Sequence, residues 1–192
     1  MTGIKGFAKR IKRYASRPEV ESIARRYFIL GAFDGALTIL GVIIGAAASG
    51  NLDARLVMSA GIGGGIALSI SSTVGAYEAE RIEAKANGKE TGRRSMSMWQ
   101  NGYQNGQRIK ALIPALVHGV SPLIAAAVPV IPFLIFDLNT AAVTSVTITL
   151  SFLFLMGLYL GSVAKERMIF TGIRFMLIGI VTSVLIVLLF GG

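Results

Sequence analysis

Residues 27–50, YFILGAFDGALTILGVIIGAAASG, form a long apolar stretch with a single charged residue, Asp34. Roughly 20 apolar residues in a helix cross the hydrocarbon core of a bilayer, so this stretch is long enough to span a membrane. A carboxylate inside such a helix costs on the order of 3 kcal/mol even on lenient insertion scales. The stretch therefore predicts a membrane helix whose acid has either a partner or a function.

Four more apolar runs of similar length follow this one in the 192-residue chain, which is 53% hydrophobic. The five predicted spans cover residues 28–49, 56–77, 111–136, 140–163 and 169–189. We therefore expect an all-α, multi-pass membrane protein with two spans in 28–77 and three in 111–192. The chain has no cysteine, which excludes disulfides, thiolate metal sites and cysteine nucleophiles.

The positive charges predict how the chain is oriented. Eight Lys and Arg residues precede the first span, and the four connections that follow carry one, seven, none and two. Because cytoplasmic segments are enriched in Lys and Arg, the N-terminus and segment 78–110 are predicted to be cytoplasmic and the C-terminus to lie outside. The net charge of +9 then reflects topology, and no motif indicates nucleic-acid binding.

The first 27 residues are predicted to form a basic amphipathic region. Ile4, Phe7 and Ile11 recur at helical spacing between lysines and arginines, a pattern typical of a helix that lies on an anionic lipid surface. A solvated basic tail is the alternative. The sequence SRPE then predicts a new helix with Ser16 as N-cap and Glu19 at the capping-box position.

Two polar strips are candidate parts of an ion path. On the first span, Thr38 lies one helical turn from Asp34. We interpret Asp34 as an ion ligand or a proton carrier, and the alternative is an acid that packs against a paired basic residue. On the second span, Ser69, Ser72 and Thr73 share one helical face, which Glu80 and Glu83 continue beyond the span. Hydroxyl and carboxylate oxygens suit a hard cation. Ordinary intrahelical hydrogen bonding is the competing interpretation.

The third span combines four prolines with the only histidine, His118. Proline kinks helices, so this span is predicted to be bent or broken. His118 is a candidate proton acceptor, with a packing role as the alternative. Elsewhere, four pairs have the GxxxG spacing that favours close helix packing: Gly31/Gly35, Gly41/Gly45, Gly61/Gly65 and Gly157/Gly161.

Four segments, taken in order, resemble the vacuolar iron transporter family. They are GAFDGALTILGVIIGAAASG, GIGGGIALSISSTVGAYEAERIEAK, VIPFLIFDL and GIRFMLIGIVTSVLIVLLFGG. The resemblance covers about residues 25–192. It implies a homodimer that exports Fe²⁺ or Mn²⁺ from the cytosol, by proton antiport, along a path near the dimer interface. Asp34 matches the family's metal-binding aspartate of the first span.

The sequence departs from the family pattern in its second span and in its cytoplasmic segment. Where the family usually has a methionine and a glutamate, this chain has Ser72 and Ala76, and the glutamate-rich cytoplasmic domain is much reduced. Losing a thioether and a carboxylate shifts a site toward harder, oxygen-rich ligation. We expect Asp34 to be the principal metal ligand and Glu78, Glu80 and Glu83 to form a cytoplasmic entrance.

The leading interpretation is thus a divalent-metal transporter of a prokaryotic cell membrane, without a permanently bound cofactor. One alternative is a non-transporting scaffold that binds lipids or a protein partner on the same fold, and another is a transporter of a different ion. An enzyme is disfavoured, because one histidine and membrane-embedded acids do not assemble a nucleophile, a base and an orienting group.

Overall fold

The computed structural model describes residues 16–90 and 97–191, and all regular structure in these ranges is helical. The helices are α2 (Pro18–Ala48), α3 (Ala54–Glu90), α4 (Ser97–Val130), α5 (Pro132–Ile135), α6 (Leu138–Ala164) and α7 (Met168–Phe190). Five of them are long and apolar enough to span a membrane. The predicted five-span, all-α membrane fold is confirmed. The basic amphipathic segment up to residue 15 lies outside the described residues.

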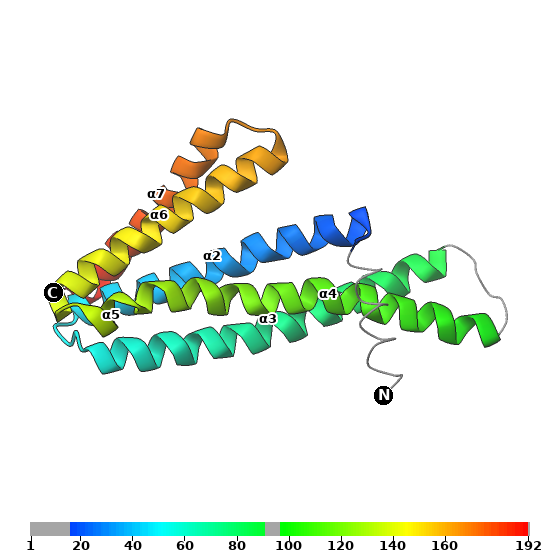
Figure 1. Cartoon of the computed structure of the whole chain (residues 1–192), viewed down its shortest axis with the longest axis horizontal. Coiled ribbons are helices and arrows are strands. Elements are labelled where there is room, and N and C mark those ends of the chain that lie inside the picture. Colours follow the sequence, from blue (N-terminus) through cyan, green and yellow to red (C-terminus); the bar gives the residue numbers. More distant parts are fainter. Residues whose placement is uncertain (1–15, 91–96, 192) are drawn as a thin grey trace.

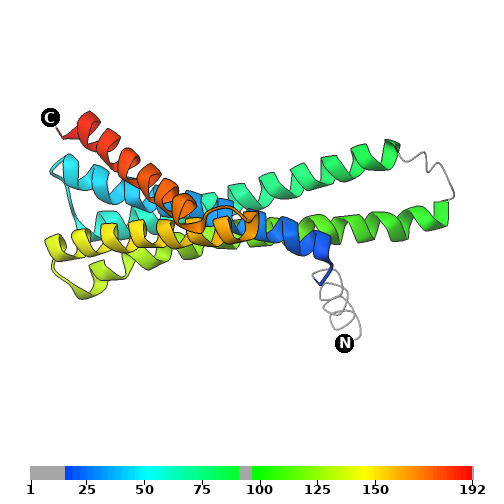
Figure 2. The same ribbon diagram turned by 90° about the horizontal axis from the view of Figure 1, so that it is seen from above.

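The described helix ends are divided between two sides of the molecule (Figure 1). One side holds the start of α2, the α6–α7 turn, the C-terminal end of α3 and the N-terminal end of α4. The opposite side holds the α2–α3 turn, α5 and the end of α7. The same division is seen from above (Figure 2). This arrangement agrees with the alternation of charge-rich and charge-poor connections. The charge-rich side is the predicted cytoplasmic side.

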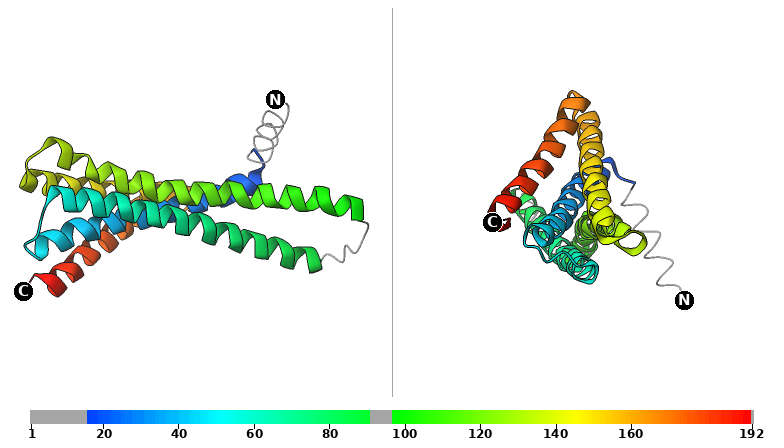
Figure 3. Two further views of the ribbon diagram at one scale, coloured as in Figure 1. Left: turned by 90° about the horizontal axis from the view of Figure 1, so that it is seen from below. Right: turned by 90° about the vertical axis from the view of Figure 1, so that its left-hand side faces the viewer.

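Helix α2 is the central element of the bundle. It contacts α3, α4, α6 and α7, and the end-on view places it between the α3–α4 pair and the α6–α7 pair (Figure 3). At the predicted outer end, Ile39 and Ile43 of α2 pack with Val57 of α3 and Val130 of α4. The apolar side chains left exposed, such as Leu188 and Leu189 of α7, cover the surface expected to face lipid.

The expected close packing is confirmed for Gly31/Gly35 and Gly157/Gly161, but not for Gly41/Gly45, where added Cβ atoms would meet only the Ile186 side chain at 3.6 and 3.8 Å. A Cβ on Gly35 would lie 2.6 Å from the Cα of Pro122 in α4, and one on Gly31 would lie 2.6 Å from the His118 carbonyl oxygen. A Cβ on Gly157 of α6 would likewise lie 2.7 Å from the Cα of Gly172 in α7. Glycine is therefore required where α2 meets α4 and where α6 meets α7.

The predicted capping of the first span is wrong. The N-cap of α2 is Arg17, without a side-chain cap hydrogen bond, and Pro18 occupies the first turn. Residues before proline favour extended backbone, and Arg17 has φ −82° and ψ 131°. The helix therefore begins one residue later than an N-cap at Ser16 requires. The Glu19 carboxylate instead lies 3.9 Å from the ammonium group of Lys110 in α4.

The prolines of the third span break it only near its end. Helix α4 continues through Pro114, Pro122 and Pro129 to Val130 and is followed by the short helix α5. Pro122 frees the carbonyl of His118, which accepts a hydrogen bond from the Ser121 hydroxyl at 3.1 Å. A carbonyl group freed by a proline in a membrane helix needs a hydrogen-bond donor within the protein, and Ser121 provides it here.

The segment between the second and third spans is more helical than the sequence indicates. The sequence of residues 87–108, NGKETGRRSMSMWQNGYQNGQR, is polar and contains four glycines, and it predicts a loop after one helical extension. Instead, α3 runs to Glu90 and α4 begins at Ser97. The segment contains no proline, and single glycines are tolerated in helices at a cost of about 1 kcal/mol each. Two long helices therefore project beyond the bundle on the predicted cytoplasmic side (Figure 1).

Candidate functional site

Asp34 lies on α2 beside the glycine face that packs against α4. Its side chain is exposed on the single chain, although it belongs to a membrane-spanning helix. Within the described residues it forms no salt bridge. Arg174, the basic residue inside the last span, is a possible partner by sequence, but it is exposed on α7. His118 is the titratable group that interacts electrostatically with it. Asp34 is therefore not a packing acid neutralised by a buried arginine.

His118 connects α4 to α2 through its ring. Its Nδ1 lies 2.9 Å from the Tyr27 carbonyl oxygen, and the two aromatic rings are 5.0 Å apart at 45°. A carbonyl oxygen can only accept a hydrogen bond, so Nδ1 carries the proton. In neutral His118 the lone pair is then on Nε2. That nitrogen is the one that can take a further proton or bind a cation.

Tyr27 extends this arrangement from α2 to α3, and the sequence analysis did not single it out. Its side chain interacts with the carboxylate of Glu80 and, at longer range, with that of Glu83. Tyr27 is seven residues before Asp34, which is about two helical turns on one face. The sequence signal that could have identified Tyr27 is its position at the predicted membrane boundary, two helical turns before Asp34.

The three cytoplasmic glutamates do not gather at one point. Glu78 accepts two hydrogen bonds from Arg81, at 2.8 and 2.9 Å, on the exposed surface. Glu80 is half-buried near Tyr27, and Glu83 is exposed. Among the described residues of one chain, no group of three His, Cys, Asp or Glu side chains could hold a metal ion.

The polar strip of the second span divides between packing and exposed surfaces. The Thr73 hydroxyl donates to the Ser69 carbonyl at 2.7 Å, and a Cβ on Gly119 of α4 would collide with the Thr73 hydroxyl. Ser69 and Thr73 therefore lie at the α3–α4 contact. Thr38 faces α3, since its Cγ2 is 3.6 Å from the position of a Cβ on Gly64.

The two positions that depart from the family pattern both lie on α3. Ser72 is half-buried, while Ala76 is 5% exposed and belongs to the buried apolar set. Ala76 thus has a packing role in the single chain.

Five apolar helices, with Asp34 in the apolar part of the first, define an integral, multi-pass membrane protein. The sequence model of the VIT family matches residues 25–111 and 93–190. The uncharacterized protein MJ0645 of Methanocaldococcus jannaschii is 37% identical over 155 residues, which cover 78% of this chain and 79% of that protein. The chain therefore belongs to the VIT family, and this membership indicates a membrane transporter of metal ions.

Proposed function

We propose that this protein exports divalent metal ions, Fe²⁺ or Mn²⁺, from the cytosol in exchange for protons, and that it does so as a homodimer in a prokaryotic cell membrane. The observation that carries the proposal is the position of Asp34. A carboxylate exposed on the outside of a single membrane bundle faces lipid, at a cost on the order of 3 kcal/mol or more. A second copy of the chain that covers Asp34 removes this cost and creates a polar space between the copies.

The exposed face of α3 supports this dimer. It carries small residues at every fourth position, and all of them are exposed: Ser59, Gly63, Ala67, Ser71, Gly75 and Ala79. Small residues at this spacing allow two membrane helices to approach closely. Thr38 of α2 faces Gly64, and α2 and α3 run antiparallel (Figure 1). Asp34, one turn before Thr38, is then at the level of residues 67–71 of the small-residue face.

A dimer also resolves the shortage of ligands within one chain. A two-fold axis near this face brings two Asp34 carboxylates to one path, together with hydroxyl groups of both copies. Oxygen ligands of this kind suit Mn²⁺ and accept Fe²⁺. The serine and alanine at positions 72 and 76 supply neither a thioether nor a carboxylate, so the proposed site is oxygen-rich.

Protons have a candidate route on the cytoplasmic side of Asp34. The His118 ring hydrogen-bonds the backbone of Tyr27 and interacts with Asp34, while the Tyr27 side chain interacts with Glu80. Imidazole, phenol and carboxyl groups can each donate or accept a proton. In the proposed cycle, protonation of Asp34 and His118 weakens metal binding and releases the ion on the outer side.

Transport into proteoliposomes tests the proposal. We expect inside-out vesicles that contain the purified protein to accumulate Mn²⁺ and Fe²⁺ faster than protein-free vesicles, and a lumen more acidic than the medium to increase the rate. Absence of divalent-metal flux from a folded, correctly inserted protein would contradict the proposal. It would favour the non-transporting scaffold. Flux that does not respond to the pH gradient would contradict proton antiport alone.

A further inference from the structure

A cavity of about 450 Å³ opens between the first half of α2 and the α6–α7 hairpin. Its size lies within the range of about 300–1,000 Å³ that is typical of small-molecule sites. The hairpin diverges from α2 toward this end of the molecule (Figure 1). The cavity lies on the predicted cytoplasmic half of the bundle, and its lining residues come from α2, α6 and α7.

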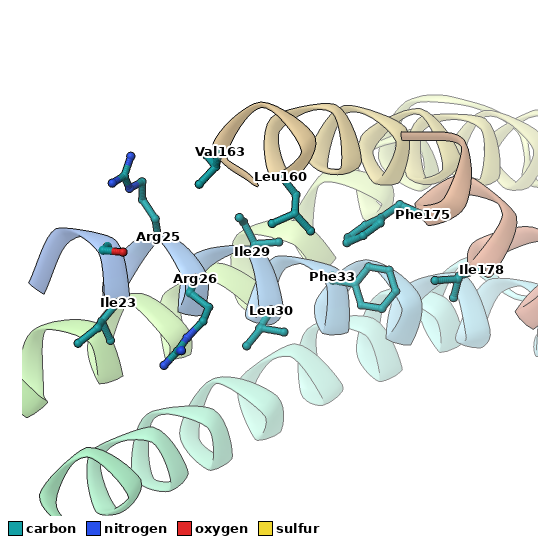
Figure 4. Close-up of a pocket in the computed structure, with 11 residues that line it drawn as sticks. Ile23, Arg25, Arg26, Ile29, Leu30, Phe33, Leu160, Val163, Phe175 and Ile178 are labelled. Carbon is teal, nitrogen blue, oxygen red and sulfur yellow. The ribbon is translucent and has the colours of Figure 1, made fainter. Parts of the chain in front are cut away.

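The inner end of this cavity is apolar. Phe33 of α2 and Phe175 of α7 meet edge to face, with ring centroids 4.9 Å apart, and Figure 4 shows the two rings next to each other. Ile29, Leu30, Leu160, Val163 and Ile178 provide most of the remaining lining. A surface of this kind in a membrane-spanning region takes an apolar chain rather than a polar solute.

The end of the cavity nearer the predicted cytoplasmic surface is positively charged. Arg25 and Arg26 line it together with Ser22. Figure 4 shows Arg25 extending on the side of α2 nearer Val163, while Arg26 extends to the opposite flank, where its guanidinium lies 5.6 Å from the Tyr27 ring. In the described part of the chain, neither arginine has a carboxylate within salt-bridge distance. Arg25 therefore offers an uncompensated positive charge beside an apolar cavity.

The spacing of the two ends fits an amphipathic ligand. Arg25 and Phe33 are eight residues apart on one helix, which corresponds to about 12 Å along the axis. The charged end lies toward the predicted cytoplasmic surface, where anionic lipid headgroups are found, and the aromatic end lies deeper in the span. A positively charged segment of this chain, such as the basic residues before Pro18, is disfavoured by repulsion from Arg25.

We propose that this cavity binds an anionic phospholipid of the cytoplasmic leaflet, with its phosphate group at Arg25 and part of an acyl chain against Phe33 and Phe175. The lipid fills the space between α2 and the α6–α7 hairpin. This proposal rests on residues of α2, α6 and α7 and does not depend on the transport proposal.

Quenching of a tryptophan reporter by brominated lipids tests the site. The chain contains one tryptophan, Trp99, so Trp99→Phe with Phe175→Trp gives a single reporter in the cavity. In reconstituted vesicles, we expect brominated phosphatidylglycerol to quench this reporter more effectively than brominated phosphatidylcholine. An increase of about fivefold in relative affinity is expected for one arginine near the phosphate, at about 1 kcal/mol. Leu160→Trp is a second reporter position if Phe175→Trp does not fold.

The matched variants separate a specific site from general surface charge. Arg25→Gln with Arg26→Gln should bring the lipid preference to about one. Lys85→Gln with Arg108→Gln removes the same charge from the helical extensions and should leave it unchanged. Equal quenching by both lipids in the parent, or equal losses in both variants, would overturn the proposal. So would the absence of quenching by either lipid, since another protein segment would then occupy the cavity.

Discussion

The Nδ1 atom of His118 lies 2.9 Å from the backbone carbonyl oxygen of Tyr27. This hydrogen bond joins α4 to α2 across 91 residues of sequence, at the level where the glycine face of α2 meets α4. It fixes the proton on Nδ1 and leaves Nε2 as the reactive nitrogen. His118 thus has a structural role through one nitrogen and a proposed proton-carrying role through the other.

Two substitutions at His118 separate these roles. The amide nitrogen of Asn can replace Nδ1 as a donor to Tyr27, so His118→Asn should keep the thermal stability of the parent but lower metal flux. His118→Leu removes the hydrogen bond and should lower the free energy of unfolding by about 1 kcal/mol. Thermal unfolding and proteoliposome flux measure the two effects. Full flux in the stable Asn variant would exclude the proton-carrying role.

Gly35 should not tolerate a methyl group. The added Cβ of Gly35→Ala would lie 2.6 Å from the Cα and 2.8 Å from the carbonyl carbon of Pro122. Because both are backbone atoms, α2 and α4 must separate, at a cost of about 1–3 kcal/mol. Gly41→Ala is the matched control, since its Cβ meets only Ile186 at an ordinary 3.6 Å. Equal thermal stability of the two variants would contradict the α2–α4 packing.

The absence of native cysteine makes the proposed dimer testable by single-cysteine cross-linking. Ala67→Cys, on the small-residue face of α3, should give a covalent dimer with a short thiol-specific cross-linker in membranes. Leu188→Cys, on the exposed face of α7, should remain monomeric under the same conditions. Cross-linking at position 188 alone would place the dimer interface on a different face of the bundle.

Asp137 provides a pH-dependent contribution to stability outside the spans. It caps α6, accepting a hydrogen bond from the Thr140 backbone N–H at 3.2 Å, and interactions with Thr140 hold the pKa of Asp137 below its usual range. A carboxylate with a lowered pKa stabilises the fold above its unfolded pKa and loses this effect as the pH falls through its folded pKa. Asp137→Ala should therefore lower the melting temperature at neutral pH.

The difference between Asp137→Ala and the parent should narrow in acid, because protonation removes the acceptor that the substitution also removes. Asn139→Ala, which changes a neighbouring exposed side chain, is the control and should show little effect at either pH. A melting-temperature difference that is independent of pH would contradict the capping role of the ionised carboxylate.

The fold could be predicted from the sequence to a large extent, because lipid imposes a simple rule on apolar length and charge. The five spans and the glycine contacts at Gly31 and Gly157 follow from spacing alone. The start of α2 was less predictable, since the local preference of the residue before Pro18 outweighed the capping-box pattern.

The candidate site was predictable as a set of residue types but not as an arrangement. Asp34 and His118 stood out because ionisable groups in a span are costly. The contact between His118 and Tyr27, and the position of Thr73 against Gly119, depend on the rotation of α3 and α4 about their axes. Periodicity gives the face of a helix but not the neighbour that the face meets.

Metal flux through Asp34→Asn proteoliposomes tests the central claim most directly, since this substitution keeps the shape of the side chain and removes its charge. We predict that Mn²⁺ flux falls by roughly tenfold or more, as expected for the loss of a group that binds the ion. Asp53→Asn, at an exposed acid in the α2–α3 turn, should retain most of the flux. Unchanged flux in Asp34→Asn would show that the first-span carboxylate is not on the ion path.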